Sequence, residues 1–206
     1  ACPKTPQDLF DVKRFPGQRS FYVGDPLVAM AFALEADGVP ANQVFPMDID
    51  RAFRKLKTIR PYIRVFWQSG DQSEQIFRSG EVGMAVIWNG RARDLAMHPT
   101  DRLNMAVSWQ GAVYEPSFEG VVKGAPHEKT AFRYLEWIAS HPDAMAAYAS
   151  RTGYGFASHQ LFKLLPESVA QWLPEYPAHF ASQVRLDFQW YTDHKAEVDA
   201  RWKEFT

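Results

Sequence analysis

The sequence predicts an α/β fold, and three observations support this. Glycine and proline residues punctuate the chain at regular intervals. Between them, short apolar runs typical of strands alternate with segments whose apolar residues recur at the period of a helix. The chain has 206 residues, of which 46% are hydrophobic, so it is long enough to bury a continuous core in one or two domains.

The first half of the chain shows this alternation most clearly. A buried strand is expected over residues 19–23, and Gly24 separates it from a helix expected over residues 26–36. Asp25 is well placed to be the N-cap of that helix, with Pro26 at its first position. The further expected elements are a helix over 50–59, a strand over 62–67, a helix from 70 ending at Gly80, a strand over 82–87, a helix from an Asn89 cap to Met97, and strands over 103–109 and 112–122.

After residue 125 the chain becomes mostly helical. This change in character predicts an α/β unit over residues 1–113 and a second unit over residues 114–206, which begins with a strand and continues mainly as helices. The elements expected in the second unit are helices near 128–139 and 142–150, a turn at 153–155, a shorter helical stretch after Ser158, and a final helix over about 190–203.

Charge and motif content exclude several classes of function. The 23 basic and 24 acidic residues are spread along the chain, so neither a nucleic acid nor an anionic membrane is an expected partner. The longest apolar runs, such as residues 84–88, are too short to cross a bilayer, so direct membrane insertion is not expected. Cys2 has no partner for an intramolecular disulfide, which leaves a lipid anchor, a free thiol or a partner upstream.

The sequence also predicts no metal, no cofactor and no catalytic residues. The six histidines show no paired spacing on a helix face, and one cysteine cannot form a thiolate cluster. The glycines are isolated, so the chain has no phosphate-binding loop, and no serine lies in a nucleophile elbow. The commonest motif-bearing enzyme classes are therefore not expected.

Aromatic residues are abundant beside the expected turns and strand ends, and acidic residues lie near them in the sequence. Any one of these rings is more often part of a core than of a ligand site, and any one of the acids is more often a cap or a surface charge. Together, however, aromatic faces and carboxylates are how proteins hold organic cations. The rings are Trp67, Trp88, Trp109, Tyr114, Tyr154, Trp190 and Tyr191, and the acids are Asp25, Glu115, Glu119 and Asp187.

Several segments, in order along the chain, resemble those of spermidine/putrescine-type extracellular solute-binding proteins. Near the start of the chain, residues 4–11 read Lys-Thr-Pro-Gln-Asp-Leu-Phe-Asp. This is similar to the segment Pro-Lys-Thr-x-x-Asp-Leu-Phe-Asp of that family. The other similar segments are Phe-Pro-Gly at 15–17, Ala-Asp-Gly-Val-Pro at 36–40, Asp-Ile-Asp-Arg-Ala-Phe at 48–53, Gly-Glu-Val at 80–82, Trp-Asn-Gly at 88–90, Lys-Gly-Ala-Pro at 123–126, Gly-Tyr-Gly at 153–155 and Leu-Asp-Phe-Gln-Trp-Tyr at 186–191.

The resemblance implies a periplasmic-binding-protein-like fold of type II, with two lobes that close on a ligand. It implies a periplasmic component of an ABC importer, not an enzyme, and this component captures a small amine and delivers it to the permease. By position, residues 1–113 would be lobe two, and residues 114–206 a hinge strand followed by the C-terminal part of lobe one. The N-terminal part of lobe one is expected to be missing, because the first residues already resemble the family's passage into lobe two.

The resemblance also implies a set of ligand-binding residues. Asp25 matches an acidic ligand residue, Trp88 a stacking ring and Tyr154 a cleft tyrosine, while Tyr191 lies at a polar contact position. The family often has Trp-x-Asp or Trp-Asp where this chain has Tyr114, Glu115, Pro116 and Ser117, and Val28 replaces a further acid of the family. With fewer matching carboxylates than the family, the expected ligand is a small cationic or zwitterionic amine and not a long polyamine. The expected ligand-binding residues are Asp25, Trp88, Tyr114, Glu115, Ser117, Tyr154 and Tyr191.

Two other functions remain open from the sequence. A carbohydrate-active enzyme also uses acids and aromatic platforms, with two carboxyls flanking the scissile bond, although no two acids are convincingly paired in the sequence. A binding protein that serves a chemoreceptor would share all the ligand-binding features of a transport protein.

Overall fold

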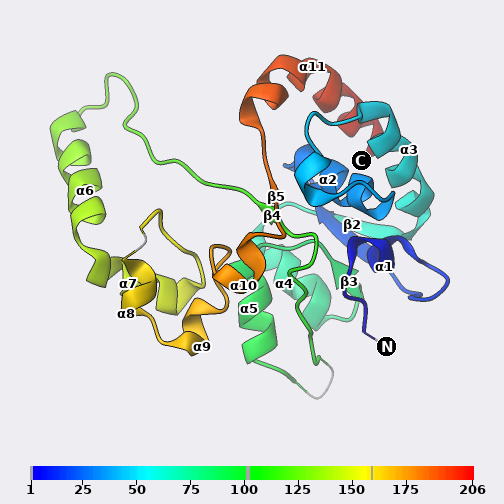
Figure 1. The fold of residues 1–206 in the computed structure, drawn as a ribbon, viewed down its shortest axis with the longest axis horizontal. Coiled ribbons are helices and arrows are strands. Elements are labelled where there is room, and N and C mark those ends of the chain that lie inside the picture. Colours follow the sequence, from blue (N-terminus) through cyan, green and yellow to red (C-terminus); the bar gives the residue numbers. More distant parts are fainter. Residues whose placement is uncertain (1, 101–102, 159) are drawn as a thin grey trace.

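A three-stranded parallel sheet organises the larger part of the molecule (Figure 1). The computed structural model describes residues 2–100, 103–158 and 160–206. The sheet has β1 (Arg19–Tyr22) in the centre, flanked by β2 (Ile63–Trp67) and β3 (Met84–Ala85). Since both pairings are parallel, the carboxyl ends of the three strands lie at the same edge of the sheet.

Each face of this sheet has an apolar core of its own, because successive side chains of a strand point to opposite faces. Phe21 and Phe66 pack into the larger core on one face, and Tyr22 and Val65 into a smaller core with Leu95 on the other. The helices whose residues build these cores are α2 (Pro26–Ala36), α3 (Ile49–Ile59) and α11 (Phe188–Phe205) for the larger one, and α4 (Gly70–Arg78) and α5 (Asn89–Met97) for the smaller one. We call residues 2–97 together with α11 the body.

Helix α2 lies at the centre of the larger core and contacts α1 (Pro6–Phe10), α3 and α11. Its sequence is apolar on all sides, as expected of a helix with neighbours all round. Two short 3₁₀ helices, η1 (Ala41–Gln43) and η2 (Arg60–Tyr62), connect the elements around α3. Arg60 of η2 donates hydrogen bonds to the carbonyl oxygens of Phe205 and Thr206, at 2.7 and 3.0 Å, which fixes the end of α11 on the body.

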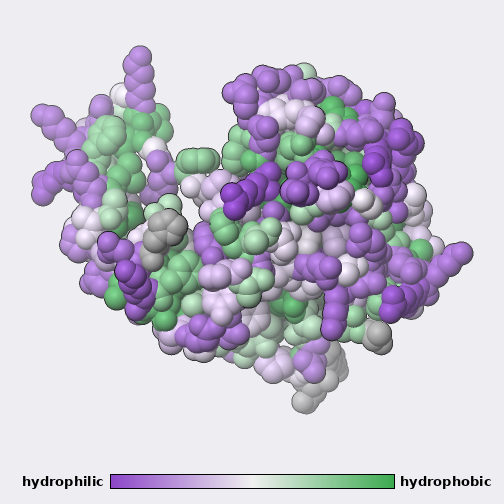
Figure 2. Space-filling view, viewed as in Figure 1, coloured by the Kyte–Doolittle hydropathy of each residue, from purple (hydrophilic) through white to green (hydrophobic). Residues whose placement is uncertain are grey.

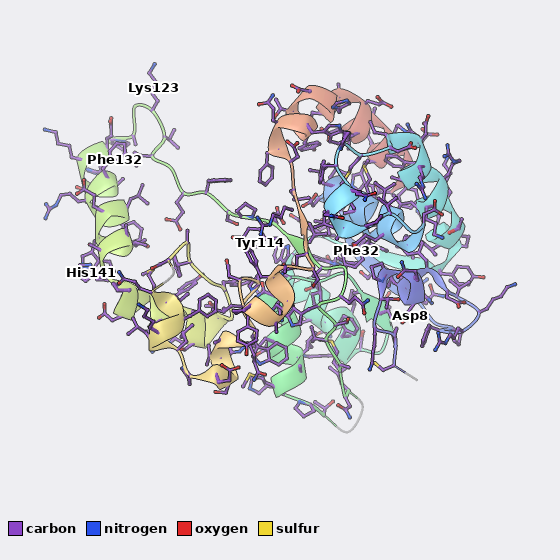
Figure 3. The ribbon with its side chains drawn as sticks, viewed as in Figure 1. Asp8, Phe32, Tyr114, Lys123, Phe132 and His141 are labelled. Atoms are coloured by element: carbon purple, nitrogen blue, oxygen red, sulfur yellow. The ribbon has the colours of Figure 1, made fainter. Side chains whose placement is uncertain are left out.

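A second, two-stranded parallel sheet lies where the chain leaves the body and returns to it. It pairs β4 (Val113–Tyr114) with β5 (Val184–Arg185), and Tyr114 marks this crossing in Figure 3. Between these strands the chain extends away, and its described residues form five further helices, which we call the outlying helices (Figure 1). They are α6 (Glu128–Ser140), α7 (Pro142–Thr152), α8 (Leu161–Leu164), α9 (Glu167–Ala170) and α10 (Pro177–Phe180).

The body and the outlying helices meet where α5 begins. Asn89 donates hydrogen bonds from Nδ2 to the carbonyl oxygens of Gly153 and Trp172, at 2.6 and 3.1 Å. Gly90 allows this close contact, because a Cβ there would lie 2.5 Å from the carbonyl oxygen of Thr152. The prediction that Asn89 caps α5 was wrong, because the N-cap is Trp88. The side-chain amide of Asn89 instead donates its hydrogen bonds to the outlying helices and their loops, and we call this contact region the seam.

Other expectations are partly met in the second half of the chain. The strand expected over 112–122 is reduced to β4, and residues 104–109 form no strand because they have no partner strand beside them. The expected division at residues 113 and 114 stays a prediction. By packing, α11 groups with the first unit, since Val198, Trp202 and Phe205 lie in the core around α2 and α3. Among the described residues, no helix combines the length and apolar character needed to cross a membrane.

Candidate ligand-binding site

A pocket of about 360 Å³ opens at the carboxyl edge of the three-stranded sheet. This is the edge at which parallel α/β sheets place their ligands. Segments far apart in the sequence form its walls: the turn from β1 to α2, the start of α5, the residue after β4 and the start of α11. The residues that line it are Tyr22, Gly24, Asp25, Pro26, Leu27, Trp88, Glu115, Leu186, Phe188 and Tyr191.

Asp25 is fixed at the N-terminus of α2. Its Oδ1 accepts hydrogen bonds from the backbone N–H groups of Leu27 at 2.9 Å and Val28 at 3.3 Å, so the predicted N-cap is confirmed. These amides and the helix dipole favour the charged form of the carboxylate. The N-cap role does not remove Asp25 from the pocket, because the capping residue is also one of its lining residues.

Glu115, the residue after β4, lines the same pocket as Asp25 and is exposed. Partial desolvation in the pocket is the main cause that raises the pKa of both carboxyls. The pKa of Glu115 rises to about 7, because the negative charge of Asp25 adds to this effect. The two acids are therefore close enough to influence each other's charge.

An aromatic cluster forms the wall beside this acid pair. The ring of Tyr22 stacks on Trp67 with centroids 4.4 Å apart, and Trp88 meets Tyr22 edge-on at 5.1 Å and Trp67 at 4.9 Å. Trp67 is buried and donates from its indole to the carbonyl of Val86 at 3.1 Å, whereas Trp88 remains 37% exposed. Trp67 thus anchors the cluster, and Trp88 and Tyr22 present ring surface to the pocket.

Gly24 is required by the position of Tyr22. A Cβ on Gly24 would lie 2.6 Å from Cζ of the tyrosine ring, and the ring cannot easily move away because it is stacked on Trp67. A glycine at this turn therefore lets the tyrosine fold back along the pocket wall.

Helix α11 supplies the opposite wall. Phe188 and Tyr191 come from its first turn, which is capped by Asp187 through a 2.9 Å bond from the backbone N–H of Trp190. Farther along α11, the indole of Trp202 donates to the carbonyl oxygen of Val23 at 2.6 Å. This bond ties α11 to the same turn that carries Gly24 and Asp25, so both walls are held together.

Of the seven predicted ligand-binding residues, four meet in this pocket. They are Asp25, Trp88, Glu115 and Tyr191. The hydroxyl of Tyr191 also donates to Oδ1 of Asp199 at 2.7 Å, which fixes the orientation of its ring.

The other three predicted residues, Tyr114, Ser117 and Tyr154, lie outside the lining. Tyr114 precedes Glu115 in an extended segment, so it points to the opposite side, where its hydroxyl donates to Oε1 of Glu175 at 3.4 Å. Ser117 is exposed. Tyr154 packs against Gly90 at the seam between the body and the outlying helices.

The structure adds pocket residues that the sequence analysis did not select, chiefly Tyr22 and Phe188. Both had a detectable signal, because Tyr22 ends an expected strand and Phe188 lies within the closing segment at 186–191. Glu175 was also missed. It lies beyond the lining, and the pKa of its carboxyl is raised, mainly by burial.

The chemistry of the lining suits an organic cation. It contains two carboxyls, three aromatic residues with faces at the pocket, and Phe188, while no Lys or Arg from the described part of the chain is among the lining residues. Within the described residues, no group of three or more His, Cys, Asp or Glu is arranged to hold a metal ion. The pocket can therefore hold an ammonium group between the carboxyls, with its alkyl carbons against the rings.

Comparisons with known proteins agree with this geometry. Residues 1–179 match the model of a family described as bacterial extracellular solute-binding proteins. The γ-aminobutyric acid-binding protein of Pseudomonas aeruginosa is 31% identical over 206 residues, which cover 98% of this chain and 57% of that protein. The spermidine/putrescine-binding periplasmic protein of Escherichia coli is 25% identical over 145 residues, covering 70% of this chain and 40% of the relative.

Solved structures show the same fold. An ABC transporter substrate-binding protein from Bradyrhizobium japonicum superposes with a TM-score of 0.85 and 31% sequence identity, over 100% of this chain and 63% of that one. The predicted α/β fold of the periplasmic-binding-protein type is thereby confirmed. The chain spans little more than half the length of the γ-aminobutyric acid-binding relative.

Proposed function

This chain belongs to the family of bacterial extracellular solute-binding proteins, and from that premise we propose that it forms part of the substrate-binding component of an ABC importer. In this proposal it captures a small amine in the periplasm and delivers it to the permease. It binds its ligand without changing it chemically.

One observation carries the proposal: two carboxyls, Asp25 and Glu115, line a pocket walled by aromatic rings. No described Lys or Arg lies in this lining, so an ammonium group would supply the positive charge that partners these acids. The rings of Tyr22 and Trp88 add cation–π attraction and cover the aliphatic part of the ligand. The arrangement therefore favours an alkyl ammonium over a sugar or an anion.

The relatives support the same ligand class. γ-Aminobutyric acid, spermidine and putrescine all carry a primary ammonium group on a short aliphatic chain. The pocket provides for that shared end of the ligand. A carboxylate at the other end, as in γ-aminobutyric acid, would need a basic group outside this lining.

The relatives argue against a carbohydrate-active enzyme. Those named above are solute-binding or substrate-binding proteins, and the matching family model is that of extracellular solute-binding proteins. A chemoreceptor-linked protein would bind the same ligands and would differ only in failing to stimulate ATP hydrolysis by the cognate importer.

Calorimetric titration with butylamine, putrescine and 4-aminobutyrate tests the proposal, with acetate and glucose as comparison ligands. We expect saturable binding of the amines. Trp88→Ala should weaken it by about 1–3 kcal/mol, as for an aromatic residue central to a binding site. Trp137→Ala is the matched control, since Trp137 is 47% exposed on α6 and lies outside the pocket.

Two results would overturn the proposal. One is binding of acetate or glucose with no binding of any amine. The other is unchanged amine affinity in Trp88→Ala when circular dichroism shows the variant to be folded.

A further inference from the structure

We infer that Phe118 determines which amines the pocket prefers, because its ring extends the aromatic wall along the aliphatic tail of a bound ligand. The inference rests on the proposed amine-binding function and narrows the ligand class to primary amines whose tail reaches the rim of the pocket. Phe118 lies outside the pocket lining. It therefore acts on the tail of the ligand and leaves the ammonium group to the acids Asp25 and Glu115.

Phe118 adjoins the pocket through Phe188. The centroids of the two rings are 6.1 Å apart and their planes are inclined by 73°, which is the edge-to-face arrangement that aromatic pairs favour. Phe188 lines the pocket from the first turn of α11. The ring of Phe118 therefore continues the wall outward from a residue that already belongs to the site.

A short piece of chain connects Phe118 to the acids. Glu115, which lines the pocket, precedes it by three residues. Residues 115–122 belong to no helix or strand, so the ring can adjust to a ligand without disrupting a helix or a sheet. The same segment thus carries an acid that attracts the ammonium group and a ring that can contact the tail.

Phe118 has a large apolar surface left to cover. It is 82% exposed, the highest fraction among the described large apolar residues, against 39% for Phe188 and 37% for Trp88. A single exposed ring would need no explanation. Phe118, however, contacts a second exposed ring that lines the pocket, so these side chains offer apolar surface at one place. A ligand tail laid against them would remove apolar area from water on both sides of the contact.

The position of the acids decides which part of the ligand meets these rings. Asp25 and Glu115 attract the ammonium group, and no described Lys or Arg in the lining offers a partner for an anionic far end. The aliphatic part therefore runs along the aromatic wall. Each further methylene group that reaches Phe188 and then Phe118 should raise the affinity, by up to about fourfold when it is fully buried.

Calorimetric titration with methylamine, butylamine and octylamine measures this contribution. For the unsubstituted chain we expect octylamine to bind about tenfold more tightly than butylamine, since its additional methylene groups are only partly buried at an open rim. Phe118→Ala should reduce that ratio to about twofold or less and leave the affinity for methylamine unchanged. Phe118→Leu keeps a smaller apolar side chain and should give an intermediate ratio.

Val122→Ala is the matched control, because Val122 is 77% exposed on the same segment and lies outside the pocket. It should leave all three affinities unchanged. Since Phe118 is so exposed, its replacement should not disturb folding, and circular dichroism checks this.

Two results would overturn the inference and leave the proposed function standing. One is an unchanged preference for octylamine in Phe118→Ala, or no such preference in the unsubstituted chain. The other is an equal loss of affinity for all three amines in Phe118→Ala, because the ring would then only support the structure of the pocket. Failure of the unsubstituted chain to bind any amine would overturn the proposed function, and this inference with it.

Discussion

Helices α3 and α6 contain nearly the same amphipathic pattern but differ in what covers them. Ala-Phe-Arg-Lys-Leu in α3 and Ala-Phe-Arg-Tyr-Leu in α6 place a phenylalanine and a leucine on one face. In α3, Phe53 is 2% exposed and Leu56 is fully buried in the core around α2. In α6, Phe132 is 49% exposed and no residue is fully buried.

The difference shows that a helical pattern predicts a buried face only where a partner surface exists. Helix α6 extends far from the body, with Phe132 on it (Figure 3). Apolar side chains gather over this part of the surface at the upper left of Figure 2. The outlying helices keep only a small core of their own, around Leu161 and Leu173. The described residues therefore leave this face of α6 without a covering surface.

The largest expected effect on the free energy of unfolding comes from truncating the matched leucines of α3 and α6 to alanine. Leu56→Ala should lower the free energy of unfolding by about 3 kcal/mol, because it leaves a cavity in the core. Leu135→Ala, at the equivalent position of half-buried α6, should cost less than about 1 kcal/mol. Urea unfolding followed by circular dichroism measures both values. Equal losses would mean that α6 is covered as well as α3.

A medium effect on stability is expected from replacing either of two acids that have a buried oxygen without a hydrogen-bond partner. They are Glu35 on α2 and Glu175 among the outlying helices. Burial raises the pKa of Glu35 from 4.5 to about 7. A carboxyl whose pKa is raised by folding stabilises the protein fully below its unfolded pKa, and this contribution is lost as pH rises through 7.

Unfolding experiments at several pH values should therefore show stability falling between about pH 5 and pH 8. Glu35→Gln should remove part of this fall and be more stable than the unsubstituted chain near pH 8, by about 1–2 kcal/mol. Glu175→Gln should change the pH dependence less, since Glu175 accepts a hydrogen bond from Tyr114. A larger change for Glu175 than for Glu35 would reverse this ranking of the two regions.

The smallest effect on stability is expected for the uncovered face itself. Replacing Phe132 and Trp137 with serine should change the free energy of unfolding by less than about 0.5 kcal/mol, because both rings are about half exposed. The same double variant should reduce self-association, since exposed apolar patches bind one another. Light scattering measures the mass. If the unsubstituted chain is monomeric at every concentration, this expectation is wrong.

The sequence predicted the body more accurately than the outlying helices. The helix expected over 26–36 is α2 with the same limits and the same cap, because its apolar run, its Asp25 cap and its Pro26 all agree. The region after β4 was predicted less well. A strand there needs a neighbouring strand, and local pattern cannot show that residues 104–109 lack one.

The sequence also predicted part of the candidate site, since four of the seven selected residues line the pocket. Glu115 and Asp25 were selected as separate acids near aromatic residues, but their meeting in one pocket depends on how β4 crosses the carboxyl edge of the sheet. Tyr114 was selected together with Glu115, although adjacent residues of an extended segment point to opposite sides. Which of the two faces the pocket depends on the register of β4 with β5, and a single sequence does not contain that information.

The bond between Trp202 and Val23 implies an order of events during synthesis. The pocket joins Tyr22, near one end of the chain, to Tyr191 on α11, so a nascent chain lacks one wall until almost all of residues 1–206 have left the ribosome. Contacts this distant in sequence form late, because the intervening segment must be ordered first. An amine added during refolding should therefore remain free until α11 has docked. Its capture would therefore report the docking of α11 on the body.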